Sequence, residues 1–249
     1  MPSPGPEISI IVPTYNEINN VGPLIQVLHH VLRGVRWEVI FVDDDSPDGT
    51  AELAQKMGRK DNRIRCIQRI HRRGLSSACI EGMLSSAAPY LAVMDGDMQH
   101  DEKLLPLMLN ILKTGEIDVA IGSRYAEGGG IGDWDPHRSR MSRLATRLSR
   151  LIVKGPITDP MSGFFMIRRT ALVHSIRGIS GLGGKILLDL LASSPIPLRC
   201  RELPYQFRSR LSGESKWDGR AAWGFGMLLL DKLMKRRTGA LYAPPPHGL

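Results

Sequence analysis

The sequence predicts an α/β fold with a mostly parallel central sheet and helices on both of its faces. Short apolar runs rich in branched residues alternate with longer segments of helical periodicity, which is typical of such sheets. At 249 residues, of which 42% are hydrophobic, the chain can bury a substantial core as one domain. No uncharged run approaches the ~20 residues that a membrane-spanning helix needs.

Five segments are expected to form buried strands because they are short, rich in β-branched residues and bounded by turn residues. These are residues 8–12, 37–42, 64–67, 90–94 and 117–121. Four segments between them repeat apolar residues at helical spacing and are expected to be helices. These are residues 21–32, 50–57, 75–86 and 104–113.

Polar clusters follow three of these strands, at residues 13–17, 43–50 and 95–99. Ligands of a parallel sheet bind beyond the carboxyl ends of its strands. The three loops are therefore expected to meet at one crevice.

Residues 7–220 are expected to form a single domain, since no shift in composition marks a linker. Residues 1–6 and the proline-rich residues 241–249 are expected to be disordered. Residues 221–240 are expected to form an amphipathic helix that lies on a membrane surface, the alternative being a packed core or dimer helix. Its apolar positions and neighbouring cations are Trp223, Met227, Leu230 and Met234, and Lys232, Lys235, Arg236 and Arg237.

The formal charge of +8 is divided unevenly along the chain. Residues 1–120 carry 12 Lys and Arg against 16 Asp and Glu, whereas residues 121–249 carry 21 against 9. A basic second half favours an anionic partner, and the lack of a basic patch interleaved with aromatic residues argues against nucleic acid. The three cysteines lack metal-site spacing, which favours reduced thiols and a cytoplasmic location.

Two carboxylates one residue apart follow the apolar run at residues 90–94. Asp95, Asp97 and Gln99 alternate, so an extended segment would place all three on one side. Such oxygen ligands hold Mg²⁺ or Mn²⁺ while phosphates and water complete the shell. The pattern predicts a metal site for a nucleotide diphosphate. A solvated turn, or an Asp97 that caps a helix beginning near Lys103, is the alternative.

Residues 43–45 place three aspartates together, which is costly unless a cation or hydrogen-bond donor lies opposite. Nucleobase N–H groups and ribose hydroxyls are such donors, and Asp44 is the residue that we expect to contact them. Tyr15 is a candidate for stacking on the base, and Glu17 for binding the ribose. The alternatives are a turn and helix cap for the acidic run, a core tyrosine and a solvated glutamate.

Residues 138–152 are expected to form a basic amphipathic helix that meets a membrane or an acidic partner. Arg138 and Ser142 are four residues apart and can converge on one phosphate as a charge and a hydroxyl donor. A solvated basic face beside a packed row of leucines is the alternative. The two stripes are Arg143, Arg147 and Arg150, and Leu144, Leu148 and Leu151.

Residues 208–216 form a second cationic segment, in which Arg210 and Lys216 would neutralise a departing nucleotide. A mobile surface loop is the alternative. The glycine-rich residues 181–185 lack the spacing of a phosphate-binding loop and are not expected to bind phosphate.

Taken together, six segments resemble the polyprenol-phosphate (dolichol-phosphate) mannose synthases, a branch of glycosyltransferase family 2. They are PTYNE at 13–17, VDDDSPDGT at 42–50, DGDMQH at 95–100, GSRY at 122–125, DPMSGF at 159–164 and GESK at 213–216. The resemblance runs from residue 8 to about residue 217. It implies the glycosyltransferase A-type (GT-A) fold of nucleotide-diphospho-sugar transferases, with residues 7–220 as the catalytic domain.

The resemblance also implies a reaction: metal-dependent, inverting transfer of mannose from GDP-mannose to a polyprenyl monophosphate. The implied metal ligands are Asp95, Asp97 and Gln99. The implied nucleotide-sugar contacts are Pro13, Tyr15, Glu17, Val42, Asp44, Asp95, Gly96, Asp97, Arg124, Arg210 and Lys216. Arg138 and Ser142 match positions that hold the lipid phosphate. The groups assigned to catalysis are Asp97, Arg124, Arg138, Ser142 and Lys216.

Three positions depart from the family pattern and bear on fine specificity: Gly96, Leu144 and Trp217 stand where alanine, glycine and leucine are frequent. Many relatives continue into transmembrane helices, so attachment to the cytoplasmic face of a membrane through surface helices or a small membrane-protein partner is expected here. A hexosyltransferase using a UDP-sugar is an alternative on the same fold. A non-catalytic module that binds an anionic membrane or nucleic acid is the alternative from another class.

Overall fold

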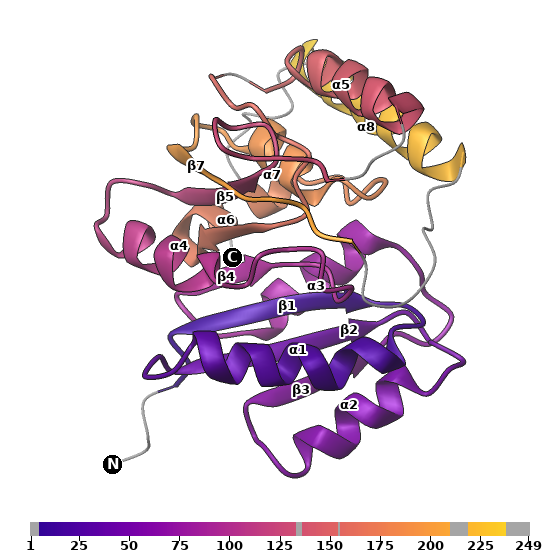
Figure 1. The fold of residues 1–249 in the computed structure, drawn as a ribbon. Coiled ribbons are helices and arrows are strands. Elements are labelled where there is room, and N and C mark those ends of the chain that lie inside the picture. The colour runs from indigo at the N-terminus through magenta and orange to yellow at the C-terminus, as the bar shows by residue number, and fades with distance from the viewer. Residues whose placement is uncertain (1–4, 133–135, 154, 210–218, 238–249) are drawn as a thin grey trace, which may run out of the picture.

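The computed structural model describes residues 5–132, 136–153, 155–209 and 219–237. Within these residues seven strands form one sheet in the order β3-β2-β1-β4-β6-β5-β7 (Figure 1). Strand β6 runs antiparallel to its neighbours β4 and β5, and the other pairs are parallel. The mostly parallel sheet expected from the sequence is confirmed.

The elements alternate along the chain as expected. The strands are β1 (Ile8–Thr14), β2 (Trp37–Asp43), β3 (Ile64–Gln68), β4 (Tyr90–Val93), β5 (Val119–Ser123), β6 (Phe165–Arg168) and β7 (Cys200–Pro204). The helices are α1 (Ile18–Val31), α2 (Thr50–Gly58), α3 (Leu75–Ser85), α4 (Leu104–Lys113), α5 (Pro136–Ser149), α6 (Arg169–Ser175), α7 (Ile186–Ser193) and α8 (Gly219–Arg237), with a short 3₁₀ helix at Ile176–Gly178.

Helix α1 begins at Ile18, three residues before the expected position. Its first N–H groups are satisfied by the loop that follows β2, because Ile18 N donates to Asp48 Oδ2 at 3.1 Å and Glu17 N donates to Thr50 Oγ1 at 2.9 Å. These caps come from residues about thirty positions away, so local periodicity does not show them.

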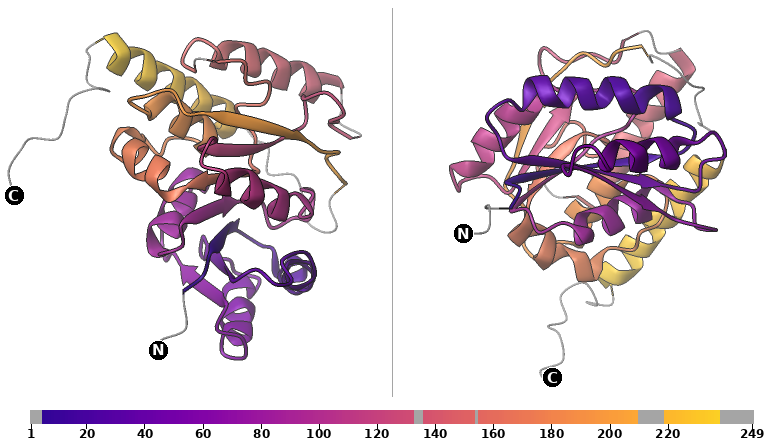
Figure 2. Two further views of the ribbon diagram at one scale, coloured as in Figure 1. Left: turned by 90° about the vertical axis from the view of Figure 1, so that its left-hand side faces the viewer. Right: turned by 90° about the horizontal axis from the view of Figure 1, so that it is seen from below.

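Side chains alternate along the central strands and build an apolar layer on each face of the sheet. Ile10 and Val12 of β1 pack with α1, α2 and α4, whereas Ile11 packs with α3, α6 and α7. Figure 2 shows α1 and the orange helices of the second layer on opposite sides of the sheet. The core therefore holds the loops at the carboxyl ends of β1, β2 and β4 in fixed positions.

Helices α5 and α8 lie side by side at one end of the molecule (Figures 1 and 2). A third apolar cluster joins them to α7 and includes Leu188 of α7, Leu228 of α8 and Ala145 of α5. Helix α5 turns Thr146 and Ser149 inward, while Leu144 and Leu151 are more than half exposed. The packed row of leucines considered as an alternative is wrong.

Two contacts hold α8 against the domain. A Cβ added at Gly224 would lie 2.9 Å from Gly183 Cα, so the two backbones touch and neither residue has room for a side chain. Lys232 is buried, and its Nζ lies 2.6 Å from Asp189 Oδ1 and donates to Gly178 O at 2.8 Å. The expectation that Lys232 is an interfacial cation is therefore wrong, because burial against Asp189 fixes it inside. Within the described residues no helix is long and apolar enough to cross a bilayer.

The three thiols are free, as expected. Burial raises the pKa of Cys66 and of Cys200 to about 12, and raises the pKa of Cys79 as well. The thiolate is the reactive form, so we expect the native protein at pH 8 to react slowly with Ellman's reagent and to release three equivalents once denatured. A native thiol that reacts within seconds would contradict this result.

Candidate functional site

Those predicted site residues that follow β1, β2 and β4 lie at the carboxyl edge of the sheet. Strand β1 pairs with β2 on one side and with β4 on the other, so the sheet reverses its order between β1 and β4. Ligands of open α/β sheets bind in the crevice at such a reversal. The loops after β1, β2 and β4 all open there.

The loop after β4 holds the predicted metal ligands. Asp97 is 4% exposed, and its Oδ1 accepts Gln99 N at 3.2 Å. The chain turns at Met98, whose φ is 63°, so a turn rather than an extended segment sets the relation of Asp97 to Gln99. Gln99 Nε2 donates to Arg208 O at 2.8 Å, which ties this loop to the segment after β7. The cap of α4 is Lys103 and not Asp97, so the capping alternative is wrong.

The side chain of His100 is buried next to the predicted ligands. Three aromatic rings surround it, Phe164, Tyr205 and Phe207, and we call them the aromatic box. The His100 ring stacks on Phe164 at 5.1 Å with an angle of 11° and meets the edges of Tyr205 and Phe207 at 5.9 Å. Burial lowers the pKa of His100 to about 4, although the nearby Asp97 carboxylate opposes the shift. The imidazole is therefore neutral at physiological pH.

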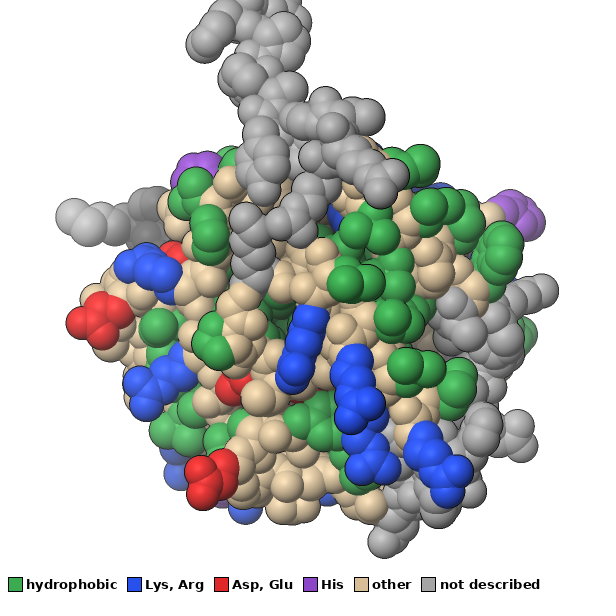
Figure 3. All heavy atoms as spheres, turned by 90° about the horizontal axis from the view of Figure 1, so that it is seen from above, with side chains coloured by type: hydrophobic (Ala, Val, Ile, Leu, Met, Phe, Trp, Pro, Cys, Tyr) green, Lys and Arg blue, Asp and Glu red, His purple; other side chains and the backbone are tan. Residues whose placement is uncertain are grey.

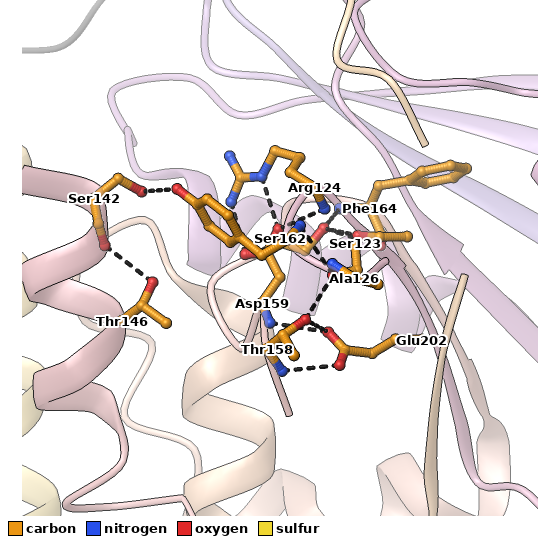
Figure 4. Close-up of polar contacts among 12 residues, drawn as sticks. Ser123, Arg124, Ala126, Ser142, Thr146, Thr158, Asp159, Ser162, Phe164 and Glu202 are labelled. Carbon is orange, nitrogen blue, oxygen red and sulfur yellow. Dashed lines mark hydrogen bonds and ion pairs between the residues drawn. The ribbon is translucent and has the colours of Figure 1, made fainter. Parts of the chain in front are cut away.

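A buried ion pair stands next to this box. Arg124 follows β5, and its Nε and Nη2 donate to the two oxygens of Asp159 at 2.7 and 2.8 Å. Asp159 is fully buried, and its own N–H donates to Glu202 of β7 (Figure 4). Although burial of Arg124 opposes its charge, the hydrogen bonds that it donates to Asp159 raise its pKa. Four charged side chains affect the pKa of the Tyr205 hydroxyl and therefore lie in one region around it. They are Arg124, Asp159, Asp95 and Asp97.

The antiparallel direction of β6 brings Asp159 to this edge. Because β6 begins here, residues 159–164 enter the strand beside the loop at residues 95–99. A Cβ added at Gly163 would lie 3.3 Å from Asp95 Oδ2. The two loops thus touch.

Tyr125 connects the loop after β5 to α5. Its hydroxyl donates to Ser142 Oγ at 2.8 Å, and Thr146 Oγ1 donates to Ser142 O at 2.9 Å (Figure 4). Ser142 therefore lies at the inner face of α5, toward Arg124 and its loop. The side chain of Arg138 and all of Arg210, Lys216 and Trp217 lie outside the described residues.

The family resemblance implies that Ser142 holds the acceptor phosphate, and on that expectation Tyr125→Phe should raise the KM for the acceptor about three- to tenfold with little change in kcat. The variant removes one hydrogen bond of about 1 kcal/mol and leaves Ser142 free to rotate. Steady-state kinetics at saturating donor measures both constants. An unchanged acceptor KM would show that the contact with Ser142 is not used.

The negative charges of Asp43 and Asp44 are stabilised by hydrogen-bond donors and a cation of the protein itself. Asp43 is fully buried and accepts from Thr14 Oγ1 at 2.9 Å and from the N–H and hydroxyl of Ser46. Asp44 accepts Gly74 N at 2.7 Å and pairs with Arg69 Nη1 at 3.1 Å. Burial raises the pKa of Asp44, against the effect of these two partners. Its contact with a base or ribose stays a prediction.

Tyr15 is stacked on a cation of the chain, because the Arg73 guanidinium lies 4.4 Å from the centre of its ring. Glu17 is nearly buried and accepts from Asn20 Nδ2 at 2.6 Å, so it is not the solvated glutamate of the alternative. Pro13 is partly exposed beside them. Val42 has no exposed side chain, which leaves only its main chain for a nucleotide contact.

Gly96 lies against β1. An added Cβ would approach Val12 Cγ1 to 3.3 Å, a tight contact that requires Val12 to move by a few tenths of an ångström. The absence of a side chain here thus relieves crowding between β1 and the loop at residues 95–99.

Sequence reasoning assigned no role to four residues that build the site: Arg69, His100, Asp159 and Glu202. His100 and Asp159 lie inside motifs that signalled the family, so the motif was the available signal. Arg69 and Glu202 stand in no motif, and only the folded chain brings them to Asp44 and Asp159.

Comparisons with known proteins agree with this arrangement. The glycosyl transferase family 2 model matches residues 9–175. Over 231 residues the chain is 36% identical to a dolichol-phosphate mannosyltransferase from Pyrococcus furiosus, covering 92% of this chain and 64% of that protein. Over 226 residues it is 37% identical to one from Saccharomyces cerevisiae, covering 86% of this chain and 82% of that protein. The chain thus spans less than two thirds of the Pyrococcus relative.

Solved structures share the fold at low identity. Glucosyl-3-phosphoglycerate synthase from Mycobacterium tuberculosis, in complex with Mn²⁺, UDP-glucose and phosphoglyceric acid, matches with a TM-score of 0.63 at 20% identity over 92% of this chain and 80% of that chain. A mannosyltransferase from Pyrobaculum calidifontis, in complex with GDP-Man and Mn²⁺, matches with a TM-score of 0.61 at 17% identity over 98% and 68%.

The sheet and the family match define the class of protein, which is that of GT-A glycosyltransferases, enzymes that transfer sugars. Identity over most of the chain narrows the class further. The chain belongs to glycosyl transferase family 2, in its branch of dolichol-phosphate mannosyltransferases.

Proposed function

We propose that the protein transfers mannose from GDP-mannose to a polyprenyl monophosphate, with inversion at the anomeric carbon and with a divalent cation. One observation supports this proposal above the others. The loop of Asp95 and Asp97 lies where the strand order of the sheet reverses, beside the buried ion pair of Arg124 and Asp159. The names of the relatives support mannose as the sugar and dolichol phosphate as the class of acceptor.

Asp95, Asp97 and Gln99 would hold Mg²⁺ or Mn²⁺. The donor set suits such an ion, because two carboxylates and an amide oxygen are hard ligands that leave places for diphosphate and water. The hydrogen bond from Gln99 Nε2 to Arg208 O turns the amide oxygen away from that carbonyl. When bound, the cation compensates the charge that develops on the leaving nucleoside diphosphate.

The protein's own residues would act mainly by positioning the two substrates. A lipid monophosphate is already ionised near neutral pH, so its oxygen needs no strong general base. Ser142, held by Tyr125, would donate to this phosphate, and Arg138 would supply charge on the same helix. Arg124, Arg210 and Lys216 would face the donor.

Direct displacement by the acceptor oxygen inverts the anomeric centre, so an α-linked donor gives a β-linked mannosyl phosphate. A product of retained configuration, identified by anomeric coupling in NMR spectra, would contradict the proposed displacement.

Turnover with defined substrates tests the proposal. Purified protein with Mg²⁺ or Mn²⁺, a short polyprenyl phosphate and a panel of nucleotide sugars should give polyprenyl phosphate mannose from GDP-mannose, as weighed by mass spectrometry. A chelator should stop the reaction, and either ion should restore it. Preference for UDP-glucose would overturn the proposed donor, and no product from any donor would overturn transfer.

We also propose that the protein sits on the cytoplasmic face of a membrane through α5 and α8, alone or with a small membrane protein. Trp223, Leu230 and Met234 of α8 are exposed beside the outward leucines of α5. Figure 3, which looks down on this end of the molecule, shows hydrophobic side chains gathered beside Lys and Arg side chains. Apolar side chains flanked by cations suit an anionic lipid surface.

Sedimentation with vesicles tests this surface. We expect the double variant Leu144→Ser, Trp223→Ser to bind vesicles of phosphatidylcholine and phosphatidylglycerol at least about tenfold more weakly, since each buried apolar side chain contributes about 1.5–3 kcal/mol. The control is Leu107→Ser on α4, an equally exposed leucine of another surface. Equal losses in both proteins would contradict the assignment.

A further inference from the structure

The loop after β4 contains a side chain, His100, that the proposed reaction does not use. Its ring is fully enclosed, and both of its nitrogens face Asp95. Nδ1 accepts the N–H of Asp95 at 3.2 Å, and Nε2 lies 3.7 Å from Asp95 Oδ2. Because Nδ1 is the acceptor, the ring proton lies on Nε2, which is near the carboxylate but beyond hydrogen-bond distance of it.

The aromatic box prevents the imidazole from turning. Phe164 covers one face of the ring at a centroid distance of 5.1 Å, and Tyr205 and Phe207 approach it edge-on. A ring held this way presents Nε2 in one direction only. The imidazole therefore holds its Nε2–H in a fixed position near the Asp95 carboxylate.

The same carboxylate is bounded on a second side. Gly163 lies so close to Asp95 that an added Cβ would be 3.3 Å from Oδ2 and 3.6 Å from Oδ1, and also 3.6 Å from His100 Cε1. The side chain of Asp95 is nevertheless about one third exposed.

We propose that His100 is a positioning residue that aims the Asp95 carboxylate at the divalent cation, through the hydrogen bond that Nδ1 accepts from the Asp95 main chain and through the electrostatic attraction of the Nε2–H, which lies 3.7 Å from Oδ2. The proposal rests on the metal site of the proposed function. Side chains that ligate metals are commonly oriented by polar partners behind them, and loss of such a partner weakens metal binding about 10- to 100-fold. Packing alone would make His100 replaceable by another aromatic ring.

Three variants separate positioning from packing. His100→Phe keeps a ring in the aromatic box but removes both polar contacts with Asp95. His100→Gln keeps an N–H donor at a similar reach. Phe207→Leu disturbs the same box while leaving the contacts of His100 with Asp95 in place.

Mn²⁺ binding in the presence of GDP, followed by electron paramagnetic resonance, is the readout, with thermal melting as the measure of packing. We expect His100→Phe to raise the Mn²⁺ Kd at least about tenfold, and His100→Gln to recover part of this loss. Phe207→Leu should lower the Tm while its Mn²⁺ Kd stays within about twofold, since packing does not orient the ligand. Wild-type affinity in His100→Phe, or an equal loss of affinity in Phe207→Leu, would overturn the positioning role.

A second measurement needs no variant. Nitrogen NMR of ¹⁵N-histidine-labelled wild-type protein should show His100 as the Nε2–H tautomer, and finding the proton on Nδ1 would overturn the proposal. Failure of the wild-type protein to bind Mn²⁺ with GDP would overturn the metal site itself. Mn²⁺ binding that survives in His100→Phe would overturn only the role of His100, so the two failures are distinguishable.

Discussion

Replacing Asp97 by asparagine is expected to lower kcat/KM for mannosyl transfer at least about a thousandfold while the protein remains folded. The amide oxygen can still accept Gln99 N, so the turn of the loop survives. The lost charge removes a ligand and leaves the departing diphosphate less compensated, and a loss of about 4 kcal/mol in the transition state corresponds to this factor.

Product formation measured by mass spectrometry, together with thermal melting, checks this expectation. Glu116→Gln is the matched control, because it removes one negative charge from an exposed position after α4. A kcat/KM within tenfold of wild type would show that Asp97 holds no essential ion. A module that only binds anionic surfaces would be indifferent to this change.

Replacing Asp159 by asparagine is expected to lower the free energy of unfolding by about 3–5 kcal/mol, because it leaves the Arg124 guanidinium buried without its counter-charge. Arg124 is nearly buried, and an arginine side chain keeps its proton at neutral pH even without a counter-charge, so it cannot escape the cost by losing that proton. Urea unfolding at 25 °C and neutral pH measures the loss.

The matched control is Asp118→Asn, which breaks a similar two-bond pair with Arg199 at the surface. Exposed pairs contribute about 0–1 kcal/mol, and the Arg199 side chain is more than half exposed. Equal losses in the two variants would contradict the special cost of burial at Asp159. The difference between them is thus the informative quantity.

The first half of the fold could be predicted from the sequence because its strands and helices carry clear periods. Helix α4, at Leu104–Lys113, has the expected bounds. Strands β6 and β7 were not anticipated, since the four residues of β6 are too few to show a period and β7 places two charged residues in succession and does not alternate. Pairing with β4 and β5 specifies β6 more than its own sequence does.

The candidate site divides in the same way. Asp95 and Asp97 could be located because they directly follow a buried strand, whereas the partners of Asp44 could not. Arg69 directly follows the carboxyl end of β3, and it contacts Asp44 because β3 pairs with β2. Lys232 was misjudged for a related reason, because its partner Asp189 lies on another helix.

The reversed direction of β6 has a consequence for engineering the protein. Because β6 enters the sheet at the carboxyl edge and leaves at the opposite rim, extra residues placed at the junction of β6 and α6 would emerge away from the substrates. An insertion just before Phe165 would instead displace Gly163 from Asp95. Fluorescent labels or affinity tags within the chain therefore belong on that opposite rim rather than before Phe165.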